Sequence, residues 1–190
     1  VLKCDIRKFF ASINQRVLMG IINLYIPDER TCSPIGNIIG SFCATPGVAH
    51  TGLPLGNLTS QLLVNIYMNE FDHFVKHKLK AKYYVRYADD FVVFSHDKDQ
   101  LIKTVSYMVV FLRHQLTLEM HSNKVCIATL ASGIDFLGWA HFPDHRVLRT
   151  STKRRMFCRI EETNGKSETI GSYLGMLSHG NAKKLREKIC

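Results

Sequence analysis

Hydrophobic residues in the first two thirds of the chain recur with a helical period in three segments. Apolar positions return every three or four residues over residues 12–25, 59–80 and 97–115, which predicts three amphipathic helices. The side chains expected to cap these helices are Ser12, Thr59 or Ser60, and Asp97. The positions expected to form the buried face of the third helix are Leu101, Val105, Met108 and Leu112.

Shorter runs between and after these helices have the pattern of β-strands. Residues 1–6 form the first run, and residues 83–88 and 91–95 form two arms separated by the adjacent carboxylates Asp89 and Asp90. The two arms predict a β-hairpin with Asp-Asp at its tip. Further strands are expected over residues 124–128, 134–142 and 146–149, the last of them pairing with the one before it.

The secondary structure expected of the remaining segments follows from their glycine, proline and charged residues. Residues 27–34 and 46–56 are rich in turn-forming residues and are expected to be loops, while residues 35–43 are weakly helical. The basic C-terminal part is expected to form two helices, over residues 152–161 and 167–177. No internal repeat or low-complexity segment interrupts this organisation.

The predicted order of strand, helices, hairpin, helix and strands is typical of an α+β fold. Its sheet is expected to be antiparallel, with the helices packed on one face. In such a sheet the end of the first strand can lie beside the hairpin tip, which would bring Asp5 to Asp89 and Asp90.

Composition agrees with a folded domain and adds a strong basic charge. The chain has 190 residues, 46% of them hydrophobic, which suits one globular domain, alone or with part of a second. No apolar run is long enough to span a membrane. The formal net charge is +9, of which +6 falls within residues 141–190. Such a segment favours a phosphate-rich partner, although a solvated basic face has the same composition.

Cysteine usage and the N-terminal residues narrow the cellular setting. The six cysteines are scattered without CxxC pairs, and no histidine stands at zinc-ligand spacing to a cysteine pair, so we expect reduced, mostly buried thiols in a cytoplasmic protein. The start, from Val1 to Asp5, is not a signal peptide. It lacks an initiator Met and opens inside a strand-like run, so we expect the chain to be a fragment.

Two adjacent acids are an unfavourable choice for a hairpin tip. Two-residue turns prefer Asn-Gly or Asp-Gly, and neighbouring carboxylates repel each other. A bound cation would offset both costs, whereas a solvated surface turn is the alternative. With Asp5 as a third carboxylate, the oxygen ligands suit Mg²⁺ or Mn²⁺ rather than zinc. Two such ions about 4 Å apart support phosphoryl transfer, with Asp5 and Asp89 bridging them and Asp90 more dispensable.

Four further features are candidates for contacts with a substrate, each with a purely structural alternative. Phe10 follows the first strand and could press against a nucleotide sugar, or it could belong to the core, as we expect for Phe9. The loop Gly52–Asn57 leads into a helix and allows close backbone approach. Gly138 interrupts a strand, which marks a close approach or only packing. Lys124 is either a functional cation or a solvated lysine.

In this order, the segments resemble the motifs of reverse transcriptases, and the match covers nearly the whole chain. The segments that carry the resemblance are Lys3-Cys4-Asp5-Ile6-Arg7-Lys8-Phe9-Phe10, Gly52 to Gln61, Tyr87-Ala88-Asp89-Asp90, Ser122-Asn123-Lys124 and Phe136-Leu137-Gly138-Trp139. The resemblance implies a polymerase palm over residues 1–149 and a partial helical thumb over residues 150–190, which includes Ser172-Tyr173-Leu174-Gly175. The fingers domain of the family is expected to be absent from this fragment.

The resemblance also implies a function and a role for each motif. The function is that of an RNA-directed DNA polymerase, which makes cDNA by two-metal-ion nucleotidyl transfer. The implied catalytic residues are Asp5, Asp89, Asp90 and Lys124, the last of them acting on the leaving pyrophosphate. The implied metal ligands are Asp5, Asp89, Asp90 and Ile6. The implied nucleotide-binding residues are Phe10, Ile6, Leu55, Gly56 and Gln61. The implied primer grip is Phe136, Leu137, Gly138 and Trp139. The residues expected to bind nucleic acid are Arg149, Lys153, Arg154 and Arg155.

The implied cofactors are two Mg²⁺ ions, for which Mn²⁺ can substitute. The implied partners are an RNA template, a DNA primer, deoxynucleoside triphosphates and, as a further candidate, a basic accessory protein. We expect no membrane partner and a cytoplasmic location in a bacterium, encoded by the bacterium or a phage.

One departure from the family pattern narrows the resemblance. Many reverse transcriptases have Gln where this chain has Leu55, and the stretch Leu55-Gly56-Asn57-Leu58-Thr59-Ser60-Gln61 is similar to the enzymes of diversity-generating retroelements. Loss of a polar contact here predicts low fidelity at template adenines. Retrons and other bacterial reverse transcriptases remain alternatives. So do an RNA-dependent RNA polymerase, against which Phe10 argues, and a degenerate palm that only binds nucleic acid or a partner.

Overall fold

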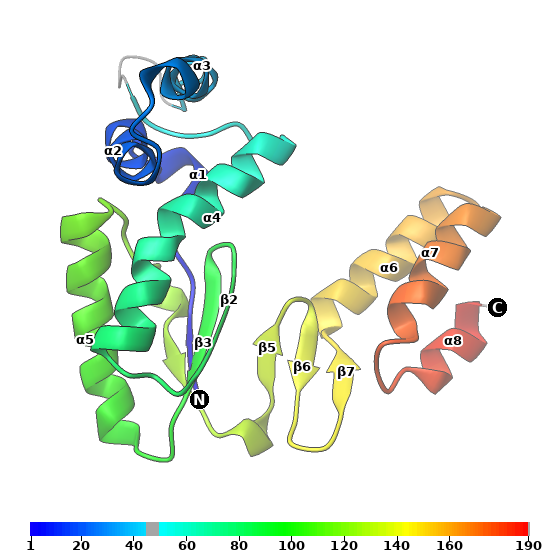
Figure 1. The fold of residues 1–190 in the computed structure, drawn as a ribbon. Coiled ribbons are helices and arrows are strands. Elements are labelled where there is room, and N and C mark those ends of the chain that lie inside the picture. The colour runs from blue at the N-terminus through cyan, green and yellow to red at the C-terminus, as the bar shows by residue number, and fades with distance from the viewer. Residues whose placement is uncertain (45–49, 190) are drawn as a thin grey trace. The chain divides into compact units, whose positions relative to one another are not determined.

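The computed structural model describes residues 1–44 and 50–189. It divides into two compact units, Val1–Ile127 and Ala128–Cys190 (Figure 1). This division differs from the palm and thumb boundary expected after residue 149, because the strands that follow Ile127 group with the C-terminal helices. The assignment of palm and thumb to these residues stays a prediction.

The first unit is built on a four-stranded antiparallel sheet. Its strands are β1 (Leu2–Cys4), β2 (Tyr83–Tyr87), β3 (Asp90–Phe94) and β4 (Cys126–Ile127), in the order β2-β3-β1-β4. β1 lies between β3 and β4, with Cys4 opposite Phe91 and Lys3 opposite Cys126. The predicted antiparallel sheet is therefore confirmed.

Two long helices, α4 (Leu58–His73) and α5 (Lys98–Gln115), cover one face of this sheet (Figure 1). The sheet presents fully buried side chains such as Leu2 and Phe91 to them, and Phe71 of α4 lies against Phe91 with ring centroids 5.1 Å apart. Asp97 caps α5 as predicted, since its carboxylate accepts hydrogen bonds from the amides of Asp99 and Gln100. Of the predicted stripe on α5, Leu101, Met108 and Leu112 are buried and Val105 is half-buried.

The α4 region departs slightly from its predicted bounds. The helix begins at Leu58, directly after Asn57, and its regular part ends at His73. A π-helical turn, Phe74–Lys78, continues it, with the Leu79 amide bonded to the Phe74 carbonyl five residues before. Most of the predicted apolar face is buried or half-buried, but Leu62 is 63% exposed.

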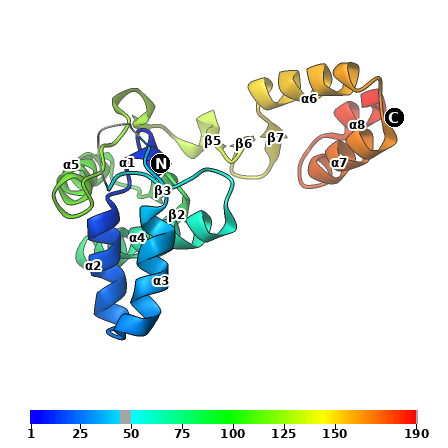
Figure 2. The ribbon, with the colours of Figure 1, turned by 90° about the horizontal axis from the view of Figure 1, so that it is seen from above.

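Three helices, α1 (Phe9–Ser12), α2 (Gln15–Tyr25) and α3 (Glu29–Gly40), connect the first strand to α4, and α2 and α3 lie side by side (Figure 2). Ser12 does not cap α2. Asn14 does, because its side chain accepts from the amides of Arg16 and Val17. The loop expected over residues 27–34 is wrong from Glu29 onward, where α3 begins.

The α3 helix forms over that segment despite Pro34. Asp28 caps it, accepting a hydrogen bond from the Thr31 amide at 2.9 Å. Its apolar side, with Ile39 buried and Ile35 half-buried, packs into the core. Capping and burial thus outweigh the disfavour of an internal proline. Residues 45–49 lie outside the described residues, so the loop expected over 46–56 is tested only from His50 onward, where the chain has no helix or strand.

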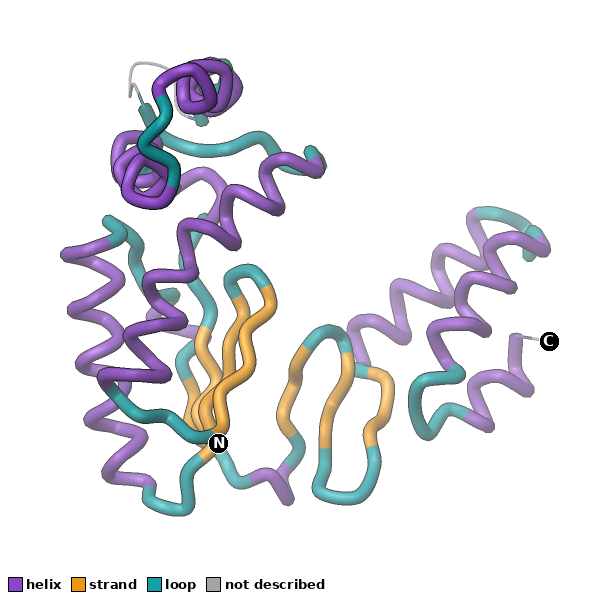
Figure 3. The backbone as a smooth tube through the Cα atoms, in the orientation of Figure 1, coloured by secondary structure: helices purple, strands orange, loops and turns teal. Residues whose placement is uncertain are grey.

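The second unit has a three-stranded antiparallel meander followed by helices. Strands β5 (Ile134–Phe136), β6 (Trp139–His141) and β7 (Arg146–Leu148) form the sheet (Figure 3), and α6 (Thr150–Glu162), α7 (Ser167–Leu177) and α8 (Lys183–Ile189) follow. The single strand expected over 134–142 is wrong. Leu137 and Gly138, with φ of 51° and 83°, form a turn that divides it into β5 and β6. The predicted pairing with the next strand is confirmed.

Short turns complete both units, and two other expectations can be checked. The 3₁₀ turns are Ser122–Lys124 and Leu130–Ser132, so the strand expected over 124–128 shrinks to Cys126–Ile127. The thiols are not mostly buried: of the cysteines described, only Cys4 is buried, whereas Cys43, Cys126 and Cys158 are exposed. Among the described residues, no helix is long and apolar enough to cross a membrane.

Candidate functional site

The β2–β3 hairpin presents the adjacent carboxylates, one position away from where the sequence suggested. Tyr87 pairs with Asp90, so the two central turn residues are Ala88 and Asp89, and Asp90 begins β3. Ala88 has a φ of 50°, in the left-handed region that normally favours glycine. Both carboxylates are only partly exposed. The tip is therefore a conformationally strained turn that carries two acids.

Asp5 follows β1 directly beside this hairpin, as predicted. Cys4 is paired with Phe91, so Asp5 comes next to the start of β3. Its carbonyl accepts a hydrogen bond from the His121 amide at 2.8 Å, and its side chain is 11% exposed. Two residues in separate sequence motifs, Asp5 and Asp90, thus lie at one end of the sheet.

Lys124 joins these acids through an ion pair. Its Nζ lies 2.9 Å from Oδ2 of Asp5, and the 3₁₀ turn that carries it is closed by a hydrogen bond from the Lys124 amide to the His121 carbonyl. Hydrogen bonding to Asp5 is the largest cause that raises the pKa of Lys124. The lysine is consequently an ammonium at neutral pH, placed against a nearly buried carboxylate.

The electrostatics of the hairpin acids favour an additional cation. Burial raises the pKa of Asp89, and the nearby Asp5 carboxylate raises it further. Burial also raises the pKa of Asp90, with Asp5 and Asp89 adding to the effect while Lys3 and Lys124 oppose it. The Oδ1 atom of Asp90 is buried without a hydrogen-bond partner. Such a buried oxygen, with the carboxylates of Asp5 and Asp89 nearby, fits a divalent cation.

The residues nevertheless do not enclose an ion as they lie. Among the described residues, no three Asp, Glu, His or Cys side chains come close enough together to hold a metal. Ile6 was expected to contribute as well. It forms an isolated antiparallel bridge with Met120, whose two hydrogen bonds use the Arg7 amide and the Asp5 carbonyl. The Ile6 carbonyl takes no part in that bridge.

The first two predicted motifs are joined by backbone hydrogen bonds. The Leu53 amide donates to the Phe10 carbonyl and the Gly52 amide donates to the Ile13 carbonyl, both at 2.8 Å. Gly52 has a φ of 88°, and a β-carbon there would meet the backbone of Ala44 at 3.3 Å. The glycine therefore allows the close approach that its sequence context suggested. Phe9 is buried as expected, and Phe10 is half-buried.

The rest of the nucleotide-binding set is open to solvent. Leu55 is 78% exposed, and Gly56 and Gln61 are exposed where the loop enters α4. Gly56 has a φ of 86°. These residues lie in the same unit as the three acids, so the structure brings the predicted metal and nucleotide segments into one folded body.

The predicted primer grip lies in the second unit and is a hairpin rather than a strand. Leu137 at its turn is exposed, whereas Trp139 is buried. The Trp139 ring packs on the loop at Gly180, and the Arg146 guanidinium lies 5.4 Å from the ring centroid. Trp139 is thus held within the protein, and Leu137 is the part of this hairpin that is open to a ligand.

The four basic residues predicted to bind nucleic acid are all exposed. Arg149 precedes α6, and Lys153, Arg154 and Arg155 lie in its first two turns. The Nε atom of Arg149 is 3.2 Å from Oδ2 of Asp135, an exposed pair of small energetic weight. In the second unit, these four side chains are therefore accessible to the phosphate backbone of a nucleic acid.

Comparison with known families decides the class of protein. Residues 1–141 match the family model described as "Reverse transcriptase (RNA-dependent DNA polymerase)". The chain belongs to the reverse transcriptase family.

Two curated relatives of this reverse transcriptase chain are bacterial. It is 26% identical over 218 aligned positions to the group II intron-encoded protein LtrA of Lactococcus lactis subsp. cremoris, covering 80% of this chain and 35% of that protein. It is 25% identical over 195 positions to the protein YkfC of Escherichia coli (strain K12), covering 80% of this chain and 48% of that protein. The chain spans between about a third and a half of the length of these relatives.

Solved structures agree with the reverse transcriptase fold. Telomerase from Candida albicans, in complex with a fragment of telomeric RNA, matches with a TM-score of 0.60 at 16% identity, covering 78% of this chain and 30% of that one. Apo telomerase from Candida tropicalis matches with a TM-score of 0.55 at 15% identity, covering 78% and 35%. At these identities the likeness concerns the fold alone.

One group beside the reverse transcriptase hairpin was missed by the sequence analysis. Arg86 of β2 bonds to Asp72 of α4 and to the Ala88 carbonyl at the hairpin tip. The signal was available in the alternation of β2, where Tyr83, Val85 and Tyr87 are exposed and Arg86 takes an inward position. A charged residue at an inward strand position needs a partner, and that requirement could have marked it.

Proposed function

We propose that this chain carries the catalytic centre of an RNA-directed DNA polymerase, which makes cDNA from an RNA template with deoxynucleoside triphosphates. The observation that carries the proposal is the acidic end of the sheet, where Asp5 meets the Asp89-Asp90 hairpin and the Asp90 Oδ1 atom is buried without a partner. Membership of the reverse transcriptase family supports the same activity.

The donor set suits Mg²⁺, with Mn²⁺ as a substitute. Asp5, Asp89, Asp90 and the Ile6 carbonyl are the groups that would hold two ions, since hard divalent cations prefer oxygen ligands. When bound, the ions would activate the attacking hydroxyl oxygen and stabilise the charge that develops on the leaving group.

The protein groups then act on one transfer step. The primer 3′-hydroxyl loses its proton to solvent and its oxygen bonds to the α-phosphorus. The bond from that phosphorus to the bridging oxygen breaks, and pyrophosphate leaves. Lys124, an ammonium placed beside Asp5, neutralises the leaving pyrophosphate or gives it a proton. Phe10 presses against the sugar and excludes a 2′-hydroxyl. Leu137 and Gly138 hold the primer end.

The basic residues of the second unit bind the template and primer mainly through phosphates. Arg149, Lys153, Arg154 and Arg155 are exposed and suit this role, which carries little sequence preference. The logarithm of affinity is expected to fall linearly with the logarithm of salt concentration. Replacing Lys153 by Ala should reduce that slope by about one, and an affinity that barely depends on salt would contradict the assignment.

Low fidelity at template adenines is a second part of the proposal, with a diversity-generating retroelement as the source. The support is Leu55, which is 78% exposed and offers no polar group to the nucleotide or template. Sequencing of cDNA from wild type and from Leu55→Gln tests this. Fewer errors at adenine in the variant are expected, and ordinary accuracy of the wild type at adenine contradicts it. A group II intron-type enzyme is the alternative suggested by LtrA.

The test of the polymerase itself is primer extension on an RNA template with Mg²⁺. It compares the full-length protein that contains this chain with Asp89→Ala and with Asp99→Ala, a matched control because Asp99 is an exposed acid in the first turn of α5. Extension by wild type and the control, lost in Asp89→Ala, is the expected result. Equal extension in all three contradicts the proposal.

A palm that binds nucleic acid without catalysis is the second candidate. The observation that favours it is that the three carboxylates do not enclose an ion as they lie. Thermal unfolding with Mn²⁺ separates the two: a catalytic site is expected to be stabilised by Mn²⁺, and the effect should vanish in Asp89→Ala. An RNA-dependent RNA polymerase is tested by Phe10→Ala, which should admit ribonucleotides if Phe10 excludes them.

A further inference from the structure

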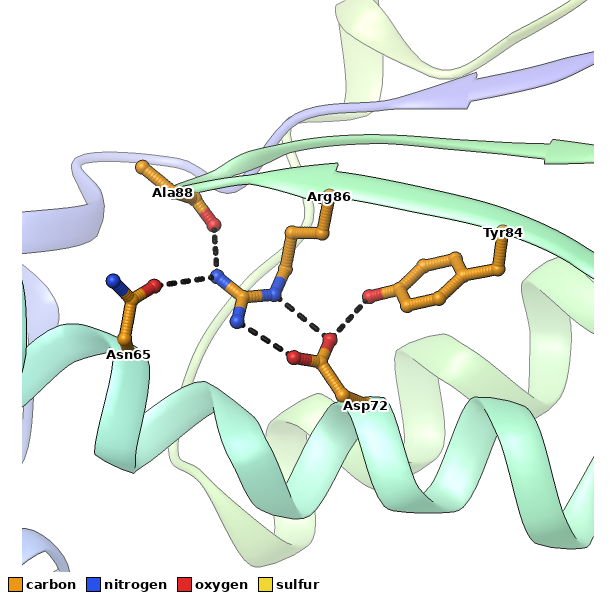
Figure 4. Close-up of polar contacts among 5 residues, drawn as sticks. All are labelled: Asn65, Asp72, Tyr84, Arg86 and Ala88. Carbon is orange, nitrogen blue, oxygen red and sulfur yellow. Dashed lines mark hydrogen bonds and ion pairs between the residues drawn. The ribbon is translucent and has the colours of Figure 1, made fainter.

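Arg86 makes four hydrogen bonds beside the tip of the catalytic hairpin (Figure 4). Its Nε and Nη2 atoms donate to the two carboxylate oxygens of Asp72 at 2.8 and 2.7 Å. Its Nη1 atom donates to the Ala88 carbonyl at 3.1 Å and to Oδ1 of Asn65 at 3.3 Å. One guanidinium therefore connects the turn of the hairpin with two positions on α4.

The Asp72 end of this network is rigid. The Arg86 side chain is only 9% exposed, and the two parallel bonds to Asp72 have the bidentate geometry that gives orientation as well as attraction. The Tyr84 hydroxyl donates to Oδ1 of Asp72 at 2.7 Å and fixes the carboxylate from the other side. Burial and the Asp72 charge raise the pKa of Tyr84, so this hydroxyl stays a donor.

The Ala88 end of the network is where the hairpin is strained. Ala88 has a left-handed φ and directly precedes Asp89, so the orientation of its carbonyl and the direction of the Asp89 side chain are coupled through one peptide unit. A residue holds such a conformation when its surroundings determine it. The Arg86 guanidinium supplies a bond to that carbonyl.

The positive charge of Arg86 is not a cause of the raised pKa values of the hairpin carboxylates, Asp89 and Asp90. The charged groups that shift the pKa values of Asp89 and Asp90 are Asp5 and Lys124, with Lys3 and Asp89 also acting on Asp90, and Arg86 is not among them. Its positive charge is neutralised by Asp72. The contact of Arg86 with the site is its hydrogen bond to the Ala88 carbonyl, which acts on the position of the hairpin backbone.

We infer that Arg86, clamped by Asp72, is a positioning residue that fixes the Ala88-Asp89 turn relative to α4, the helix whose first turns carry the predicted nucleotide-binding residue Gln61. The inference rests on the proposed polymerase function. It adds a residue outside the predicted motif roles, because Arg86 holds the hairpin backbone and touches neither a reacting atom nor a catalytic carboxylate.

The experiment compares wild type with Arg86→Lys in the full-length protein that contains this chain. Lysine keeps the positive charge and one hydrogen bond to Asp72, but it lacks the planar guanidinium whose Nη1 atom reaches the Ala88 carbonyl. We expect kcat for primer extension to fall about 10- to 100-fold, the range found for groups that orient ligands of a metal site. KM for the nucleotide and the pH midpoint of the rate should stay at their wild-type values. Arg113→Lys, an exposed arginine near the end of α5, is the matched control.

A second variant covers the case in which Arg86→Lys does not fold. Asn65→Ala removes only the hydrogen bond from Nη1 of Arg86 to Oδ1 of Asn65 and leaves the Arg86–Asp72 pair intact, so this variant should fold like wild type. Its kcat is expected to fall about two- to tenfold, the effect of losing one long hydrogen bond of 3.3 Å, at an unchanged melting temperature.

The outcomes separate the inference from the function on which it rests. Unchanged kcat in a folded Arg86→Lys, or in Asn65→Ala where Arg86→Lys does not fold, overturns the positioning role. So does a loss of rate that disappears on cooling to a temperature at which Arg86→Lys is fully folded, because that pattern describes stability alone. Extension that survives Asp89→Ala instead refutes the proposed function.

Discussion

Replacement of Gly180 by Ala tests how the predicted primer-grip hairpin is held. A β-carbon at Gly180 would meet the six-membered ring of Trp139, with Cη2 at 2.7 Å and Cε3 at 2.9 Å. The ring has little room to move, because Trp139 is buried and Arg146 lies against it while bonding to the His179 carbonyl. Gly180 does not have a positive φ, so the effect of the substitution comes from this contact and not from backbone strain.

The expected destabilisation follows from overpacking. Forcing a methyl group against a fixed ring typically costs about 1–3 kcal/mol, measured as a lower free energy of unfolding in urea. Gly171→Ala is the control, since Gly171 lies inside α7 with open space around its β-carbon position, and alanine there should stabilise by about 0.5–1 kcal/mol. If Gly180→Ala is as stable as Gly171→Ala, the Trp139 ring does not pack on this loop and the reasoning fails.

Three further outcomes are expected. Tyr67→Phe should destabilise by about 1–3 kcal/mol in urea unfolding, because the buried Tyr67 hydroxyl donates to the Leu116 carbonyl at 2.6 Å, whereas Tyr107→Phe at an exposed position should change little. Cys4, whose pKa burial raises to about 12, should resist iodoacetamide in the native protein while the exposed Cys158 reacts, as peptide mass spectrometry would show. Mn²⁺ affinity should be lost as pH falls through a midpoint above 3.8, because the pKa values of Asp89 and Asp90 are raised and these ligands take up protons at a higher pH than an ordinary aspartate does. A midpoint below 3.8 in a titration of Mn²⁺ affinity against pH contradicts this.

The elements predicted correctly are those with a local signal. The Asp97 cap and the helical period of the apolar residues predict α5 at residues 98–115. The period of apolar residues over 167–177 likewise predicts the bounds of α7. The place of Asp5 beside the hairpin was expected because an antiparallel sheet allows it, and the pairing of β1 with β3 brings the end of β1 to the start of β3.

The errors come from packing that a local pattern does not contain. Pro34 suggested a loop, yet the cap at Asp28 and the burial of Ile39 keep α3 helical through it. The run from Ile134 to Phe142 has mostly strand residues, and its turn falls at Leu137 and Gly138, which both have a positive φ. Gly138 was interpreted as a close approach within one strand, and the leucine before it carries no sequence signal for a positive φ, so a single strand was predicted.

Backbone strain occurs within three of the motif segments, although residues such as Lys80, Thr117 and Asn164 have the same conformation outside them. Lys8, Ala88 and Leu137 all have a φ near 50° without being glycine, and each lies within a motif segment: Lys8 between Asp5 and Phe10, Ala88 before Asp89, and Leu137 at the tip of the second-unit hairpin. Local propensity opposes these conformations, so the surrounding fold must impose them. The sequence therefore identifies the chemistry through its side chains, whereas the orientation of those side chains depends on turns that no local rule predicts. At Ala88 the structure offers a specific source for that constraint, the bond from Arg86.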